Sequence, residues 1–142
     1  MKLLLIEDND NISDMIAQYM RLKGYDCMVI DNGKDGLDQM LSKNYDVALL
    51  DLAMPEFSGY DVIESLEKKG KMKEQKIIIL TAYAITESKM KELEERGVYS
   101  CLKKPVHLSE LVKVIQSCAE SWIGIKIFHY IDFTYDVRTT QD

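Results

Sequence analysis

Five polar side chains suited to phosphate and metal chemistry each follow a short apolar run of the sequence. Carboxylates stand at Glu7, Asp8 and Asp51, a hydroxyl at Thr81 and an ammonium at Lys104. A small group of carboxylates suits Mg²⁺, which prefers oxygen ligands and often shares its site with phosphate. A carboxylate can also be the nucleophile that forms an aspartyl phosphate, while a cation, a lysine and a hydroxyl neutralise the transferring group. The residue types therefore indicate phosphoryl transfer.

Each of these residues also has an ordinary structural explanation. An acidic pair after a strand is commonly the start of a helix, and a single aspartate is a frequent loop residue. The chemical interpretation therefore depends on whether the fold brings the five side chains together.

Five short segments have the composition of strands, and they alternate with segments of helical period. In the first helical segment, apolar residues recur at three- and four-residue steps, as on the buried face of a helix: Ile12, Met15, Ile16 and Met20. Strands that are apolar on both faces imply a parallel sheet covered by helices on both sides. The expected strands are residues 3–6, 25–30, 47–50, 77–80 and 99–102, and the last two helices are expected over 86–96 and 108–121.

Right-handed crossovers restrict such a sheet to a doubly wound topology. We predict an α/β fold with a flavodoxin-like sheet of five parallel strands in the order 2-1-3-4-5, in which ligands bind beyond the carboxyl ends of the strands. The first and third strands are neighbours in that order, so Glu7, Asp8 and Asp51 would converge. Three carboxylates so close repel one another unless a cation is present.

The composition excludes several classes of protein. A chain of 142 residues can form one hydrophobic core, and 46% apolar with 30% charged residues is typical of a globular domain. The net charge of −6 argues against direct binding to nucleic acid. The three cysteines have no metal-ligand spacing, and we find no signal peptide or membrane span, so we expect a cytoplasmic protein with reduced thiols and no membrane partner.

The last 21 residues follow a different pattern from the rest. Apolar side chains occupy every second position from Ile123 to Ile127, which is typical of a strand. We predict one domain over residues 1–121 and a β-like C-terminal extension over residues 122–142. Because an unpaired strand tends to find another edge, the extension would self-associate or begin an output segment.

Residues 2 to about 121 resemble the receiver domain of response regulators. The segments that carry the resemblance, in the order of the family, are Leu4-Leu5-Ile6-Glu7-Asp8, Leu49-Leu50-Asp51 with Met54-Pro55 and Gly59, Leu80-Thr81-Ala82, and Lys104-Pro105. The resemblance implies the same strand order, so that order is not an independent prediction. It also implies a two-component or phosphorelay switch.

The resemblance assigns roles to the residues of the cluster. Asp51 resembles the phosphoacceptor, which takes the phosphoryl group from a phosphohistidine of a histidine kinase or a histidine phosphotransfer protein. Asp8 resembles the direct Mg²⁺ ligand beside Asp51, Glu7 a ligand through water, and Ala53 the residue whose main-chain carbonyl completes the metal site.

The remaining matched residues concern the phosphoryl group and the switch. Lys104 is expected to pair with a phosphoryl oxygen, and Thr81 to be the hydroxyl that moves toward it. Pro105 is expected to follow a cis peptide bond. One position departs from the family, because Cys101 stands where the switch aromatic is expected. A small buried thiol is the simpler explanation of Cys101, and a redox sensor the alternative.

We interpret the chain as a signalling module that phosphorylates and slowly dephosphorylates itself, rather than a metabolic enzyme. Its fourth helix, fifth strand and fifth helix, or its extension, would serve as a dimer surface. A Mg²⁺-dependent phosphohydrolase would need a second carboxylate at position 53, and a flavin or nucleotide binder a phosphate loop after the first strand. An interaction module independent of phosphorylation, or a DNA-binding domain beyond this sequence, would also be consistent with the pattern.

Overall fold

The computed structural model of the protein describes residues 1–82 and 84–121. The predicted extension over residues 122–142 lies outside the described residues.

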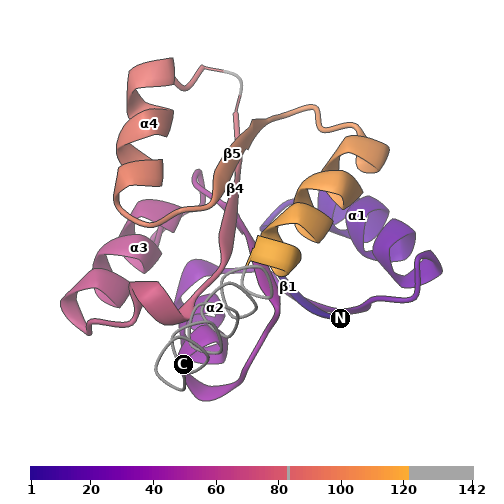
Figure 1. The fold of residues 1–142 in the computed structure, drawn as a ribbon, viewed down its shortest axis with the longest axis horizontal. Helices are drawn as coiled ribbons and strands as arrows, with labels where there is room; N and C mark the ends of the chain where they lie inside the picture. Colours follow the sequence, from indigo (N-terminus) through magenta and orange to yellow (C-terminus); the bar gives the residue numbers. More distant parts are fainter. Residues whose placement is uncertain (83, 122–142) are drawn as a thin grey trace, which may run out of the picture.

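A sheet of five parallel strands forms the centre of the molecule (Figure 1). Its order is β2-β1-β3-β4-β5, and each neighbouring pair is parallel, which confirms the predicted topology. Every residue of β3 and β4 is buried, as expected for strands covered on both faces. The strands are β1 (Lys2–Ile6), β2 (Asp26–Ile30), β3 (Val47–Asp51), β4 (Ile77–Thr81) and β5 (Ser100–Lys103).

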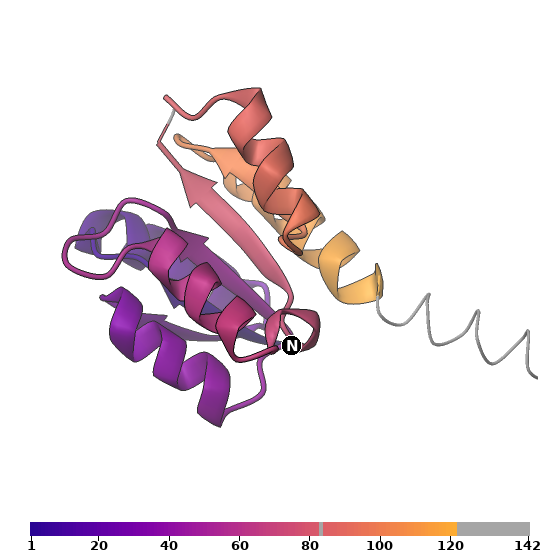
Figure 2. The same cartoon turned by 90° about the vertical axis from the view of Figure 1, so that its left-hand side faces the viewer.

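Helices cover both faces of this sheet, and alternate strand residues face the two layers (Figures 1 and 2). Leu3 and Leu5 pack under α1 (Asp10–Leu22) and under the C-terminal helix (residues 108–121). Leu4 and Ile6 belong to the opposite core cluster, with the helices α2 (Gly33–Ser42), α3 (Gly59–Lys68) and α4 (Glu87–Glu95).

Local sequence sets where the helices begin. The side chains of Asn9, Asn32, Ser58 and Thr86 each accept a hydrogen bond from a main-chain N–H of the first turn, as N-cap residues do. A single 3₁₀ turn, η1 (Met72–Glu74), precedes β4 and was not predicted. It is too short to leave a periodic pattern in the sequence.

The predicted core face of α1 was wrong at one position. The buried residues of this helix are Ser13, Ile16, Ala17 and Met20. This i, i+3, i+4, i+7 stripe leaves Met15 to one side, and Met15 is 47% exposed.

Helix α4 has the weakest attachment to the core among the labelled α-helices. Leu93 is its one buried residue. Near the end of the helix, the Arg96 guanidinium forms a salt bridge with Glu67 of α3. At the other end, the Lys89 ammonium lies 5.2 Å from the centre of the Tyr60 ring. The buried contact of α4 is therefore in its last turn, and its first turn is attached through Lys89.

Candidate phosphoryl-transfer and metal site

The strands place the polar residues of the motif at one edge of the sheet. Ile6 of β1 pairs with Leu50 of β3, so Glu7 and Asp51 each come one position later on neighbouring strands. Asp51 in turn pairs with Leu80, which precedes Thr81 at the end of β4. The expected convergence at the carboxyl ends of the strands is therefore present.

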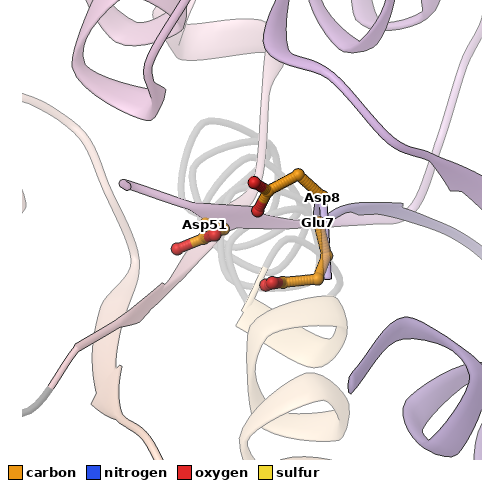
Figure 3. A group of neighbouring side chains, drawn as sticks. All are labelled: Glu7, Asp8 and Asp51. Atoms are coloured by element: carbon orange, nitrogen blue, oxygen red, sulfur yellow. The ribbon is translucent and has the colours of Figure 1, made fainter. Parts of the chain in front are cut away.

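The three carboxylates of this edge form a cluster (Figure 3). One oxygen from each of Glu7, Asp8 and Asp51 lies within 4.8 Å of the others. Glu7 and Asp51 are buried, whereas Asp8 is exposed. The cluster is thus open to solvent on the side of Asp8, and a ligand can enter there.

Lys104 reaches the cluster from the loop after β5. Its Nζ donates a hydrogen bond to Glu7 Oε2 at 2.8 Å and lies 3.4 Å from Asp51 Oδ1. The main-chain N–H of Lys104 donates to the Thr81 carbonyl at 2.7 Å, which fixes the start of this loop against β4. The bond between Lys104 and Pro105 is cis, as the resemblance implied. The ammonium therefore sits between two carboxylates.

The surroundings of Asp51 oppose its ionisation. Burial raises the pKa of Asp51 to about 6, and the nearby Glu7 carboxylate acts in the same direction, against the opposing effect of Lys104. The Ala53 N–H, which donates to Asp51 Oδ1 at 3.2 Å, also favours the charged form. Since a bound cation would stabilise the carboxylate, the site is arranged to favour cation binding.

The donor set of the cluster fits Mg²⁺. All three side chains offer carboxylate oxygens, which this ion prefers, and the open side leaves room for the water molecules that it retains. Ala53 lies in the exposed loop two residues after Asp51, where a main-chain carbonyl can join the set.

Thr81 and Cys101 lie on the neighbouring strands β4 and β5. The Thr81 hydroxyl is buried and donates to the Ala82 carbonyl at 3.1 Å, at the start of the loop before α4. Cys101 is half-buried, and its Sγ is 4.0 Å from the Met90 carbonyl. Burial, with a smaller effect of Glu94, raises the pKa of this thiol to about 11. The environment thus favours the core interpretation of Cys101 over the redox sensor.

Gly59 is a positioning residue that the sequence indicated only as part of the family pattern. A Cβ at this position would lie 2.5 Å from the Asp51 carbonyl oxygen and 2.8 Å from Leu52 Cα. The absence of a side chain therefore lets the start of α3 pack directly on the main chain of Asp51.

Residues 3–116 match the family model of the response regulator receiver domain. The chain belongs to this family. It is 35% identical over 111 residues to a cyclic di-GMP phosphodiesterase of Thermotoga maritima, covering 78% of this chain and 29% of that protein. It is 34% identical over 116 residues to the transcriptional regulatory protein DltR of Streptococcus agalactiae, covering 82% of this chain and 50% of that one. The receiver thus spans half or less of these two relatives.

Solved structures agree with the family assignment. The receiver domain of the Francisella response regulator 1452 superposes with a TM-score of 0.77 at 27% identity, over 84% of this chain and 97% of that one. The receiver domain of a LuxO repressor protein from Vibrio parahaemolyticus shares the fold, with a TM-score of 0.80 at 22% identity, over 89% and 95% of the two chains.

Membership of the family gives the general function. Receivers are signalling modules, not metabolic enzymes, and response regulators receive phosphate from histidine kinases. Receiver domains typically bind Mg²⁺ through acidic residues, and this chain has a cluster of three, Glu7, Asp8 and Asp51. Within residues 1–82 and 84–121, no helix has the length and apolar character that a membrane span requires.

Proposed function

We propose that this receiver accepts a phosphoryl group on Asp51 from a phosphohistidine, with Mg²⁺ held by Asp8, Asp51, the Ala53 carbonyl and, through water, Glu7. The observation that carries the proposal is the convergence of three carboxylates within 4.8 Å, with the Lys104 ammonium 3.4 Å from Asp51. When bound, Mg²⁺ would neutralise charge on the phosphoryl oxygens. Of the three carboxylate ligands, Asp8 is the exposed one.

The transfer step uses Asp51 as a nucleophile. A carboxylate oxygen forms the new bond to phosphorus as the bond from phosphorus to the histidine nitrogen breaks, and the released imidazole takes up a proton from water. The nucleophile must be ionised, and Asp51 would be held in its ionised form more readily with a cation bound beside it. The Ala53 N–H holds one carboxylate oxygen in place.

Lys104 and Thr81 would respond to the new group. Lys104 is close enough to exchange its contact with Asp51 for one with a phosphoryl oxygen, which removes charge repulsion from the product. The Thr81 hydroxyl, now bonded to the Ala82 carbonyl, would turn toward the phosphoryl group and release that carbonyl. The loop between β4 and α4 would then rearrange, which is the switch.

The surface beside the site suits a macromolecular donor. An apolar groove of about 510 Å³ runs along α1 and reaches Lys104, with Ile12, Met15 and Val106 in its walls. A phosphohistidine on a protein can approach Asp51 only if its carrier contacts the surrounding surface. The exposed Met15 gives such a carrier an apolar contact in the groove that reaches Lys104.

The phosphohydrolase alternative lacks a residue that it requires. Such an enzyme needs an acid or base two residues after its nucleophile, and this chain has Ala53 there. We therefore expect only slow hydrolysis of the aspartyl phosphate by water. The phosphorylated state would persist for a time and then return to the unphosphorylated state.

The first experiment is the intact mass of the chain after incubation with Mg²⁺ and acetyl phosphate. We expect the gain of one phosphoryl group, which requires Mg²⁺ and is lost in Asp51→Asn. The matched control is Asp38→Asn, which changes an exposed aspartate of α2 and should leave the gain intact. Transfer from a phosphorylated histidine kinase or phosphotransfer protein should show the same dependence.

A chain that binds Mg²⁺ and gains no mass would contradict the proposal. It would favour an interaction module that does not depend on phosphorylation. A gain that persists in Asp51→Asn would place the acceptor elsewhere.

A further inference from the structure

Helix α2 packs against the loop that carries one of the proposed Mg²⁺ ligands, although it contributes no residue to the carboxylate cluster. A Cβ at Gly33, the first residue of α2, would lie 2.3 Å from the Phe57 carbonyl oxygen and 3.1 Å from Phe57 Cδ1. Only glycine leaves room for the main chain of Phe57 at this distance. Phe57 follows Ala53, whose carbonyl is the proposed main-chain ligand, in the same loop. We call residues 52–58 the metal loop.

The metal loop is closed at its base. The Gly59 N–H donates to the Leu52 carbonyl at 3.0 Å, which ties the start of α3 to the chain that leaves β3. Leu52 and Met54 are buried in the core cluster beneath α2 and α3, and Ala53 lies between them on the exposed side. The base of the loop therefore has little freedom, and the position of the rest depends on what the loop contacts near Phe57.

The chain between Ala53 and Phe57 forms a tight turn. The Phe57 N–H donates to the Pro55 carbonyl at 2.7 Å. Glu56, at the centre of this turn, has a φ of +67°, which residues other than glycine rarely adopt and which persists only where the surroundings enforce it. The proline ring also fixes φ at Pro55. A displacement of Phe57 is therefore passed back along the chain to Ala53 rather than absorbed within the turn.

Helix α2 is held against the sheet and has no room to retreat from the loop. One turn after Gly33, a Cβ at Gly36 would lie 2.6 to 2.9 Å from three side-chain atoms of Ile6, so the helix already lies directly on β1. Leu37 and Met40 of α2 are buried in the same core cluster as Ile6. Moving the helix outward would open a cavity in this core, whereas the metal loop has an exposed side and can shift into solvent.

We propose that Gly33 is a positioning residue for the Mg²⁺ site, acting through the Phe57 main chain on Ala53. The inference rests on the proposed Mg²⁺ ligand set. Helix α2 and the base of the loop hold the loop from two sides and keep Ala53 beside Asp51, to whose Oδ1 the Ala53 N–H donates at 3.2 Å. Because Mg²⁺ requires nearly ideal octahedral geometry, a side chain at position 33 that pushed the loop would weaken binding of the ion.

The variant Gly33→Ala in the full 142-residue chain tests the proposal. Isothermal titration calorimetry should show a loss of Mg²⁺ affinity of about tenfold, as for other residues that orient a metal ligand. The matched control is Gly70→Ala. Nothing lies within 4 Å of a Cβ at Gly70, but its φ of +65° is unfavourable for alanine, so this variant should lose stability and keep the wild-type Mg²⁺ affinity.

A second readout requires no metal. Hydrogen exchange of the Ala53 amide, followed by NMR in the presence of a chelator, reports on its hydrogen bond to Asp51. Gly33→Ala should accelerate this exchange several-fold, and Gly70→Ala should not. Phe57→Ala should also accelerate it, because the variant creates no clash and removes the side chain that packs the loop against the core. This variant keeps the test available if Gly33→Ala does not fold.

Three results would overturn the proposal. Wild-type Mg²⁺ affinity in Gly33→Ala would show that the contact with the loop does not set the site. Equal losses of affinity in Gly33→Ala and Gly70→Ala would assign the effect to lower stability. Unchanged exchange of the Ala53 amide in Phe57→Ala would show that the two ends of the turn are not coupled. If the wild-type chain bound no Mg²⁺, the proposed ligand set would be wrong, whereas faster Ala53 exchange in Gly33→Ala would still support the positioning of the loop by Gly33.

Discussion

Glu7 and Lys104 lie 97 positions apart in the chain and form a salt bridge, with Lys104 Nζ 2.8 Å from Glu7 Oε2. Glu7 is buried and Lys104 is partly buried, so water gives this pair little screening. The same ammonium lies 3.4 Å from Asp51. Lys104 is therefore a counter-ion to two carboxylates before any phosphate or metal arrives.

Lys104→Met should destabilise the metal-free domain. The substitution leaves two buried carboxylates without their cation, and we expect the free energy of unfolding to fall by about 1–3 kcal/mol. Urea unfolding in the presence of a chelator measures the change. Lys103→Met is the matched control, because the neighbouring Lys103 is exposed, and it should change stability by less than about 0.5 kcal/mol. Equal stability of the two variants would show that Lys104 is not the required counter-ion.

Asp51→Asn should stabilise the metal-free domain near neutral pH. The pKa of Asp51 is raised to about 6 in the folded state, so its ionised form opposes folding above that pH. Removing the charge should add about 1–3 kcal/mol at about pH 8. As pH falls through about 6 toward about 4, the folded wild type takes up the proton and regains this stability, so the difference between the two proteins should vanish. Urea unfolding at several pH values, without Mg²⁺, gives the comparison. A difference in free energy of unfolding between the two proteins that grows as the pH falls would contradict the prediction.

Asp8→Asn should weaken Mg²⁺ binding without much effect on folding. Asp8 is exposed, so the change should cost little stability, but it removes one of the three carboxylates of the cluster. We expect at least about a tenfold loss of affinity by isothermal titration calorimetry. Asp10→Asn changes a nearby exposed aspartate outside the cluster and is the matched control. Similar affinities for the two variants would argue against the proposed ligand set.

Cys101 should react slowly with thiol reagents. Burial raises the pKa of this thiol to about 11, so at about pH 7.5 its thiolate fraction is about a hundredth of that of an ordinary cysteine. We expect its alkylation by iodoacetamide, followed by peptide mass spectrometry, to be at least about tenfold slower than that of a cysteine introduced by Ser42→Cys on the exposed end of α2. Faster reaction at Cys101 would revive the redox-sensor hypothesis.

The sequence was sufficient for the strands and for the edge at which the polar residues meet. Uninterrupted apolar runs such as 47–50 leave few alternatives to a strand covered on both faces, and strand order then makes Asp51 a neighbour of Glu7. The Asp51–Lys104 contact could be expected only as a family feature. The direction of a long lysine side chain depends on its rotamer and on the loop that carries it, which no periodic pattern encodes.

Other features were beyond prediction for physical reasons. Met15 has a core-like spacing, but the width of a buried stripe depends on what packs against the helix, and this residue lies just outside it. The 2.5 Å approach of a Cβ at Gly59 to the Asp51 carbonyl depends on the path of the chain after β3. Hydrophobicity carries no signal for either feature.

The attachment of α4 differs between its two ends. Leu93 and the Arg96–Glu67 salt bridge hold its last turn, whereas its first turn contacts α3 through the Lys89 ammonium above the Tyr60 ring, so we expect the end at Thr86 to move most. The nine residues of α4 make a helix about 13 Å long, and its first turn is joined to the loop that begins after Thr81. The last turn also carries the exposed Glu94 and Glu95. A rearrangement started at Asp51 would therefore displace the Thr86 end of α4 more than its last turn.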